Sequence, residues 1–524
     1  MYTFSSKLKT FSFILMIVGI LGIGYGFLTA PKDIQEVEKI LAAESHGHGG
    51  GHEAASHVTG PAGSSAAKAH VNHEAEVVSV EQAAQPAGAP EEVDSTHATA
   101  EHQGDTIAGV HHGEGADAED KTFSTPTNPT SVNKMHTEHA AAEAHDAHAE
   151  HQAHLVHVLH QLQNKPWAAV YVACIFFMLL SMGVLAFYAI QQVAQAGWSP
   201  VLFRVMQGIT AYLPVGSVIF FIFLLLCGFH FNHLFIWMKE GVTDPASPNY
   251  DHLIANKSGY LNFPFWIIRA AIFLIGWNLY RYFSMKNCLA QDDSKDDSFY
   301  KKNFKMSASF LVFFIVTESI MSWDWIMSID PHWFSTLFGW YVFASFFVSG
   351  ITAICMVTLY MKAKGYLEYV NTSHIHDLAK FMFGISVFWT YLWFSQFMLI
   401  WYANIPEEVT YFITRIEHYN LPFFGAVVMN FVFPILILIN TDFKRITWVL
   451  VMAGTVILLG HYIDFFNMIM PATVGDQWFI GAAEIGSVLF FLGLFIFVVF
   501  TAMTKAPLLP KRNPFIEESK HFHY

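Results

Sequence analysis

The sequence predicts an all-α protein that crosses a membrane about ten times. Of its 524 residues, 53% are hydrophobic, 16% are aromatic and only 13% are charged. Apolar stretches of about 20 residues, long enough to cross the roughly 30 Å hydrocarbon core of a bilayer, recur along the chain. Their composition is helical and lacks the alternation of a membrane β-barrel. We expect spans near residues 11–30, 166–192, 209–236, 263–285, 306–329, 335–361, 379–403, 421–440, 446–469 and 478–503.

Residues 1–30 predict an N-terminal transmembrane anchor. The basic residues Lys7 and Lys9 precede the apolar stretch, which is long for the core of a signal peptide. Pro31 directly follows Ala30, and this is a poor position for cleavage. We therefore expect an uncleaved helix, although cleavage would leave every other span unchanged.

Residues 31–160 are low-complexity sequence rich in Ala, His, Glu and Gly, and we expect them to be largely disordered and solvated. Eighteen of the 28 histidines lie here, one at every third position from His145 to His160. Such a tract has ligands suited to Zn²⁺ or Cu²⁺. A three-residue step on a helix turns about 60° backwards, however, which spreads the imidazoles around the axis, so we expect no specific metal site. Residues 151–167 predict a surface helix that leads into the second span.

The remaining spans form a transmembrane domain of nine helices over residues 161–505, followed by a tail at 506–524. Lys and Arg concentrate on alternate connections, including 295–305, 362–364 and 444–445, whereas 406–418 is neutral or acidic. Because short loops that stay in the cytoplasm keep positive charge, we expect both termini inside and the His-rich segment outside.

Several classes of chemistry have no motif in this chain. The four cysteines form neither C-x-x-C nor C-x-x-C-H, so the chain alone is expected to ligate no c-type haem and no iron–sulfur cluster. A Walker loop and a dinucleotide glycine pattern are also absent from the sequence, which argues against ATP and NAD chemistry.

Ionisable residues inside the spans are the candidate functional groups, because they are costly in a membrane and usually mark a pathway or a site. The predicted orientation places Glu318 near mid-membrane and Asp324 toward the outer face. His461 and Asp464 lie one turn apart in the outer half of the ninth span. We predict that Glu318, Asp324, His461 and Asp464 handle protons.

A quinol pocket open to the outer side is a second expectation, with Asp324, Arg269 and Gln396 as its candidate residues. The structural alternatives stay open: Arg269 is able to pair with Asp324, Asp464 or Glu484, and His461 to bond Asp464 as a clamp. The inner half offers mainly hydroxyls such as those of Ser307 and Ser349, and no continuous proton path is visible there.

Two functions of other classes remain open. A cation or metal transporter would account for the His-rich loop, but it would need carboxylates and histidines on facing helices around the midplane. A b-type haem anchor would need two axial histidines at equal depth, for which His230 or His233 with His461 are the candidates. An absorbance spectrum distinguishes the haem anchor from a chain without cofactor.

The segment SWDWIMSIDPHWFSTLFGWYVFASFFVSG at 322–350, with Glu318 before it and a His-rich insert after a single N-terminal helix, resembles the ActF-type membrane subunit of bacterial alternative complex III. That complex is a quinol:cytochrome c or quinol:acceptor oxidoreductase, and the subunit is similar to the NrfD/PsrC family. The resemblance covers about residues 165–505.

The resemblance implies two four-helix bundles with peripheral helices in a bacterial inner membrane. It also implies an NrfD-like sister membrane subunit, an iron–sulfur subunit and haem c subunits as partners, and no nucleic acid. Menaquinol or ubiquinol would be the substrate of the complex, and this chain would bind no cofactor itself. A quinol site is usually assigned to the sister subunit, so the role implied here is assembly and proton handling.

Overall fold

A computed structural model describes residues 2–47 and 129–523, with side chains described for 2–42 and 150–523. The described chain contains helices and no strand. It divides into two units, Met1–Glu44 with Ala147–Tyr524, and Ser45–Asp146. The site and its surroundings all belong to the first unit.

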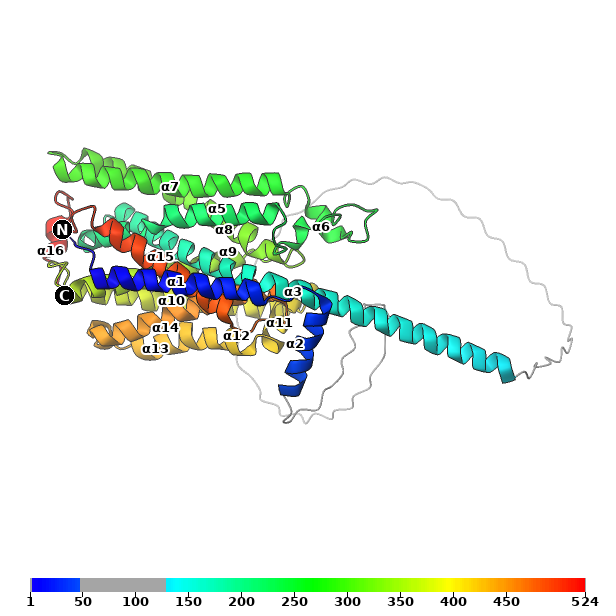
Figure 1. Cartoon of the computed structure of the whole chain (residues 1–524). Helices are drawn as coiled ribbons and strands as arrows, with labels where there is room; N and C mark the ends of the chain where they lie inside the picture. The colour runs from blue at the N-terminus through cyan, green and yellow to red at the C-terminus, as the bar shows by residue number, and fades with distance from the viewer. Residues whose placement is uncertain (1, 48–128, 524) are drawn as a thin grey trace, which may run out of the picture. The chain divides into compact units, whose positions relative to one another are not determined.

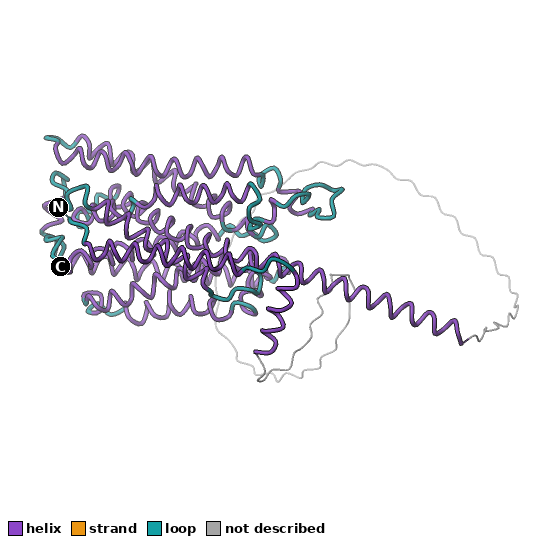
Figure 2. The backbone as a smooth tube through the Cα atoms, viewed as in Figure 1, coloured by secondary structure: helices purple, strands orange, loops and turns teal. Residues whose placement is uncertain are grey.

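Within the described residues, ten helical segments are long and apolar enough to cross a membrane, which confirms the all-α polytopic class. Figures 1 and 2 show them side by side. They are α1 (Ser6–Thr29), α3 (Pro129–Val193), η1 to α5 (Pro200–Gly228), α7 (Phe263–Asp293), α8 (Ser298–Trp325), α9 (Phe338–Ala363), α10 (Thr372–Ala403), α12 to α13 (Asn420–Leu438), α14 (Thr447–Val474) and α15 (Ala482–Met503).

The helices outside the spans define two sides of the bundle, which we name for what they carry. The terminal side holds both chain ends, the turn between α7 and α8, and α16 (Ile516–Lys520). The loop side holds α2 (Ile34–Gly47), α6 (His252–Lys257), η3 (Met327–Ile329) and α11 (Pro406–Glu417). In the predicted orientation the loop side faces outward.

The third span is shorter at its end than predicted. Helix α5 ends at Gly228, and His230 follows with a left-handed φ of 60°. The backbone N–H of Phe231 returns to the carbonyl of Leu226, which closes the helix as a C-cap does. We had expected His230 and His233 on the third span, but they lie on the loop that follows it.

Helix α3 is the centre of the packing. Its membrane-length part is the most deeply buried of the spans, and its aromatic residues contact several neighbours. Tyr171 packs on Phe220 of α5 and donates to the carbonyl of Trp325 in α8. Phe176 packs on Tyr462 of α14. Helix α5 packs on α7, α7 on α8 and α8 on α9, while α9, α10, α12, α13 and α14 pack together.

The peripheral pair α1 and α15 is held by small residues. An added Cβ at Gly19 would lie 2.4 Å from the backbone nitrogen of Phe490, and one at Gly486 would lie 2.7 Å from that of Ile23. Such distances are closer than a side chain permits, so the two backbones touch where only glycine fits. The first span is thus packed as an integral helix.

The 31–160 segment is more ordered at its ends than predicted. Helix α2 and the first part of α3 are helical, and Val37 of α2 is fully buried against Leu155 and Val158 of α3. These few apolar side chains stabilise helix in a segment whose overall composition suggested none. The expected surface helix over 151–167 is confirmed as part of α3. The predicted disorder of 48–128 concerns residues outside the described ones.

Candidate functional site

Asp324 forms a closed ion pair with Arg269 at the loop-side end of α7 and α8. The Arg269 Nε and Nη2 atoms lie 2.7 and 2.9 Å from the two carboxylate oxygens, which is the bidentate geometry that arginine favours. Asp324 has no exposed surface and Arg269 is also buried. Of the partners left open by the sequence, the structure selects Asp324 for Arg269.

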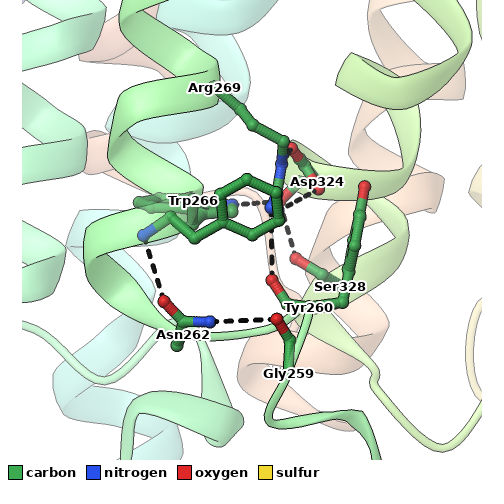
Figure 3. Close-up of polar contacts among 8 residues, drawn as sticks. Gly259, Tyr260, Asn262, Trp266, Arg269, Asp324 and Ser328 are labelled. Atoms are coloured by element: carbon green, nitrogen blue, oxygen red, sulfur yellow. Dashed lines mark hydrogen bonds and ion pairs between the residues drawn. The ribbon is translucent and has the colours of Figure 1, made fainter.

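The surroundings of this pair hold it in place (Figure 3). Trp266 Nε1 and Ser328 Oγ donate to the backbone carbonyl of Asp324 at 2.8 and 2.6 Å, so side chains satisfy the end of α8. The guanidinium lies over the ring of Tyr260 at 4.0 Å. Asn262 caps the start of α7 by accepting from the backbone N–H of Phe265. Every polar group named here has a partner, and this favours a structural clamp.

Asp464 on α14 is bound very differently. Its carboxylate accepts from the hydroxyl of Tyr341, from Ser345 Oγ at 2.8 Å and from Trp389 Nε1 at 2.9 Å. These donors come from α9, which packs on α14, and from α10, which packs on α9. Asp464 is buried, and no lysine or arginine pairs with it among the described residues.

His461, one turn before Asp464, completes this group. Its Nδ1 lies 3.8 Å from Asp464 Oδ2, which is too long for a direct hydrogen bond. Ser345 Oγ bridges the two, at 3.0 Å from His461 Nδ1. The ring is fully buried, and its Nε2 makes no hydrogen bond within the described part of the chain. Asp464 and His461 therefore form a buried acid and base joined by a hydroxyl.

A π-helical turn lies beside His461. Asn430 belongs to η4 (Val428–Val432), and an added Cβ at Gly460 would lie 2.1 Å from its Oδ1. Neither atom of the buried amide has a partner among the described residues. Single π-helical turns often occur at functional sites, and here the turn brings an unpaired amide next to the residue that precedes His461.

A pocket opens on the loop side, next to the part of α14 that follows Asp464. Its volume is about 80 Å³, and its lining includes Met468, which lies one helical turn beyond Asp464. Phe338, which contacts the ring of Tyr341, also lines it. The other lining residues are Ile326, Met327, Asp330, Trp333, Thr410, Tyr411, Thr414, Arg415, Pro471 and Ala472. The volume is enough for a few water molecules or a small polar group.

Arg415 is the buried cation of this pocket, and only 4% of its surface is exposed. Its Nε donates to the carbonyl of Asn467 and its Nη1 to that of Tyr411. The guanidinium stacks on the Tyr411 ring, which in turn stacks on Trp333 at 4.1 Å. Burial raises the pKa of Tyr411, so its hydroxyl stays protonated at neutral pH. No carboxylate pairs with Arg415 in the described structure.

The other predicted site residues do not join this group by any contact in the described structure. Glu318 is buried on α8, with one carboxylate oxygen accepting from Ser319 and the other unpaired there. The Gln396 amide nitrogen on α10 is also buried without a partner in the same part of the chain. Glu484 accepts from the backbone N–H of Gly481 and caps α15. In the described structure, the four residues predicted to handle protons therefore fall into at least two separate groups, Asp324 with Arg269 and His461 with Asp464.

The terminal side carries a polar network that the sequence reasoning missed. Arg204 of α4 pairs with Asp292 of α7 at 2.5 Å and donates to Gln207 at 2.9 Å. The Tyr188 hydroxyl accepts from Gln207 at 3.1 Å and from Asn303 at 3.2 Å. The sequence did not indicate this network, because its residues are far apart in the chain and Asp292 lies in an Asp-rich stretch that resembles a loop.

Among the described residues, no group of three or more His, Cys, Asp or Glu side chains has the arrangement of a metal site. The rings of His160 and His233 lie 6.3 Å apart on the surface, and His461 is enclosed by Trp389 and Ser345.

The comparisons with known proteins give no family for this chain. No protein-family model and no curated protein sequence matches it. What the structure establishes is thus a polytopic helical protein of membrane type, with buried carboxylates that include Asp324 and Asp464.

Proposed function

We propose that this chain is a membrane subunit of a quinol-oxidising respiratory complex and that it moves protons through Asp464 and His461. The respiratory context is supported by the resemblance of residues 322–350. The proton-handling role is supported by one observation: Asp464 is a buried carboxylate bound only by neutral hydroxyl and indole donors, with a histidine one turn away.

The geometry suits reversible proton storage. A carboxylate held by a bidentate arginine gains nothing from protonation, since the cation already neutralises it. The Asp464 and His461 pair has no such fixed countercharge, so one proton is able to reside on either group while Ser345 joins them. Buried ionisable groups in membranes are frequently parts of proton relays, and this pair has the required acid, base and bridge.

The pocket supplies the route to the loop side. Tyr341 bonds Asp464 and contacts Phe338, which lines the pocket. Asp330 also lines it, with nearly half of its side chain exposed. We propose that protons pass from Asp464 by way of Tyr341 to the pocket and leave past Asp330, under the positive potential of Arg415. In the predicted orientation this is the outer side, where quinol oxidation by the partner subunits would release protons.

The test uses the whole complex that contains this chain, reconstituted in liposomes. Asp464→Asn and His461→Ala are expected to lower proton release about tenfold or more, with the complex still assembled by size-exclusion chromatography. Asp476→Asn, an exposed position just beyond α14, is the matched control and is expected to behave as wild type. Full quinol-dependent cytochrome reduction with normal proton release in both variants would refute the proposal. Loss of assembly without loss of rate per complex would instead assign the pair a structural role.

A further inference from the structure

The membrane-facing surface between α7 and α8 carries a groove that differs from an ordinary lipid-exposed face. It offers about 400 Å³, and its lining includes Ser309 of α8 and Gly276 of α7, against which the Phe313 ring packs. Leu279, Phe283 and Phe313 form apolar walls. Lys305 is the one charged residue in its lining. The groove is independent of the Asp464 site, which lies on other helices.

Further cations surround the terminal-side end of this groove. Lys302 lies one turn from Lys305 on the same face of α8, and Lys286 lies one turn beyond Phe283 on α7. All three lysines are exposed, and none forms an ion pair among the described residues. The groove is therefore apolar along its length and cationic at one end.

Four aspartates lie nearby, at positions 292, 293, 296 and 297, and none forms an ion pair with Lys286, Lys302 or Lys305 among the described residues. Asp292 is already paired with Arg204. Asp296 accepts from the hydroxyls of Ser294 and Ser298 within the turn between α7 and α8. Lys305 lies seven residues into α8 from Ser298, which is roughly 10 Å along the helix axis. Its long apolar stem allows the ammonium group to reach the level of lipid phosphates.

We propose that this groove binds one anionic phospholipid, with the phosphate on Lys305 and Lys302 and an acyl chain against Leu279, Phe283 and Phe313. Charge complementarity selects this occupant: basic pockets between transmembrane helices on the cytoplasmic side are suited to anionic head groups. A zwitterionic lipid would fill the apolar part equally well, but its headgroup cation would offset the negative charge that its phosphate brings to the lysines. The site binds a specific lipid and does not belong to the general lipid belt.

The neighbouring groove between α5 and α7 provides an internal control. It offers about 460 Å³ and is lined by residues such as Val218, Ile222, Ala271 and Ile275, with no charged side chain in its lining. Both grooves share helix α7 and have similar size. A preference for anionic lipid is expected in the α7–α8 groove alone.

The experiment embeds the full chain in nanodiscs that contain equal amounts of phosphatidylglycerol and phosphatidylcholine, and counts retained lipids by native mass spectrometry. Wild type is expected to retain phosphatidylglycerol preferentially. Each of Lys302→Gln and Lys305→Gln is expected to lower that preference about fivefold. Ser309→Trp, which fills the groove without changing charge, is expected to abolish it. Ala271→Trp in the control groove and Lys364→Gln at the end of α9 are expected to leave it unchanged.

Two results would overturn the proposal. The first is equal retention of both lipids by wild type, or an unchanged preference in the lysine variants and Ser309→Trp. The second comes from a benzophenone amino acid placed at Ser309 in native membranes. A phospholipid adduct supports the site, whereas a polypeptide adduct shows that a protein partner occupies the groove.

Discussion

The ion pair between Arg269 and Asp324 allows a quantitative test of its role as a clamp. Arg269→Met keeps most of the side-chain volume but leaves the Asp324 carboxylate without a cation at a position that has no exposed surface. Breaking a buried pair in this way costs about 3–5 kcal/mol of unfolding free energy. The lost contact of the guanidinium with Tyr260 adds about 0.5–1 kcal/mol.

The double variant Arg269→Met with Asp324→Leu should recover most of this loss. It removes both charges, and replacing a buried pair by apolar residues is often neutral or stabilising. Trp266 and Ser328 bond the backbone carbonyl of residue 324, so these contacts survive the substitution. We expect the double variant to lie within about 1 kcal/mol of wild type.

Reversible unfolding of the purified chain in mixed micelles, titrated with sodium dodecyl sulfate, measures these free energies. Arg281→Met is the matched control on the same helix, because Arg281 has no ion pair in the described structure. It is expected to cost little or nothing. The reasoning fails if Arg269→Met loses less than about 1 kcal/mol, or if the double variant is as unstable as the single one.

Three further predictions concern the fold around the site. Gly22→Leu should destabilise the pairing of α1 with α15 by about 1–3 kcal/mol, since the added Cβ would lie 2.9 Å from the Ala482 carbonyl oxygen. Gly24→Leu should leave the pairing unchanged, because an added Cβ there meets no atom within 4 Å. Thermal melting of the two variants measures the difference. Val37→Asp should detach α2 and expose Lys39 to trypsin about tenfold faster. Glu38→Gln at an exposed position should leave α2 docked, and equal digestion rates of the two variants would contradict this packing. Asp251 caps α6, and although burial acts to raise its pKa, bonds from His332 and from the backbone of Ile254 leave that pKa below the ordinary 3.8. Because the pKa of Asp251 is lower in the folded than in the unfolded chain, the ionised carboxylate stabilises the folded state above the unfolded pKa, and this contribution is lost as the pH falls through the folded pKa. Hydrogen exchange in α6, corrected for its intrinsic pH dependence, should therefore rise below pH 3.8 in wild type. Asp251→Asn should show no such step.

The sequence located the charged residues of the spans but not their partners. Asp464 and His461 are three residues apart, so helical periodicity alone placed them on one face. Tyr341, Ser345 and Trp389 lie on other helices, and nothing in their spacing pointed to Asp464. Arg415 lies in a segment that reads as a surface helix with acidic neighbours, so its burial was not predictable from composition.

Hydrophobicity and length by themselves determined that this chain is a bundle of about ten membrane-length helices, because a bilayer accepts few other structures. They also placed Asp324, His461 and Asp464 within these helices. Tertiary packing alone decided that Asp324 is neutralised by Arg269 while Asp464 is held by neutral donors beside a histidine. The physical reason is that the energy of a buried carboxylate depends on the donors and charges within a few ångströms of it, and those arrive from helices distant in the chain.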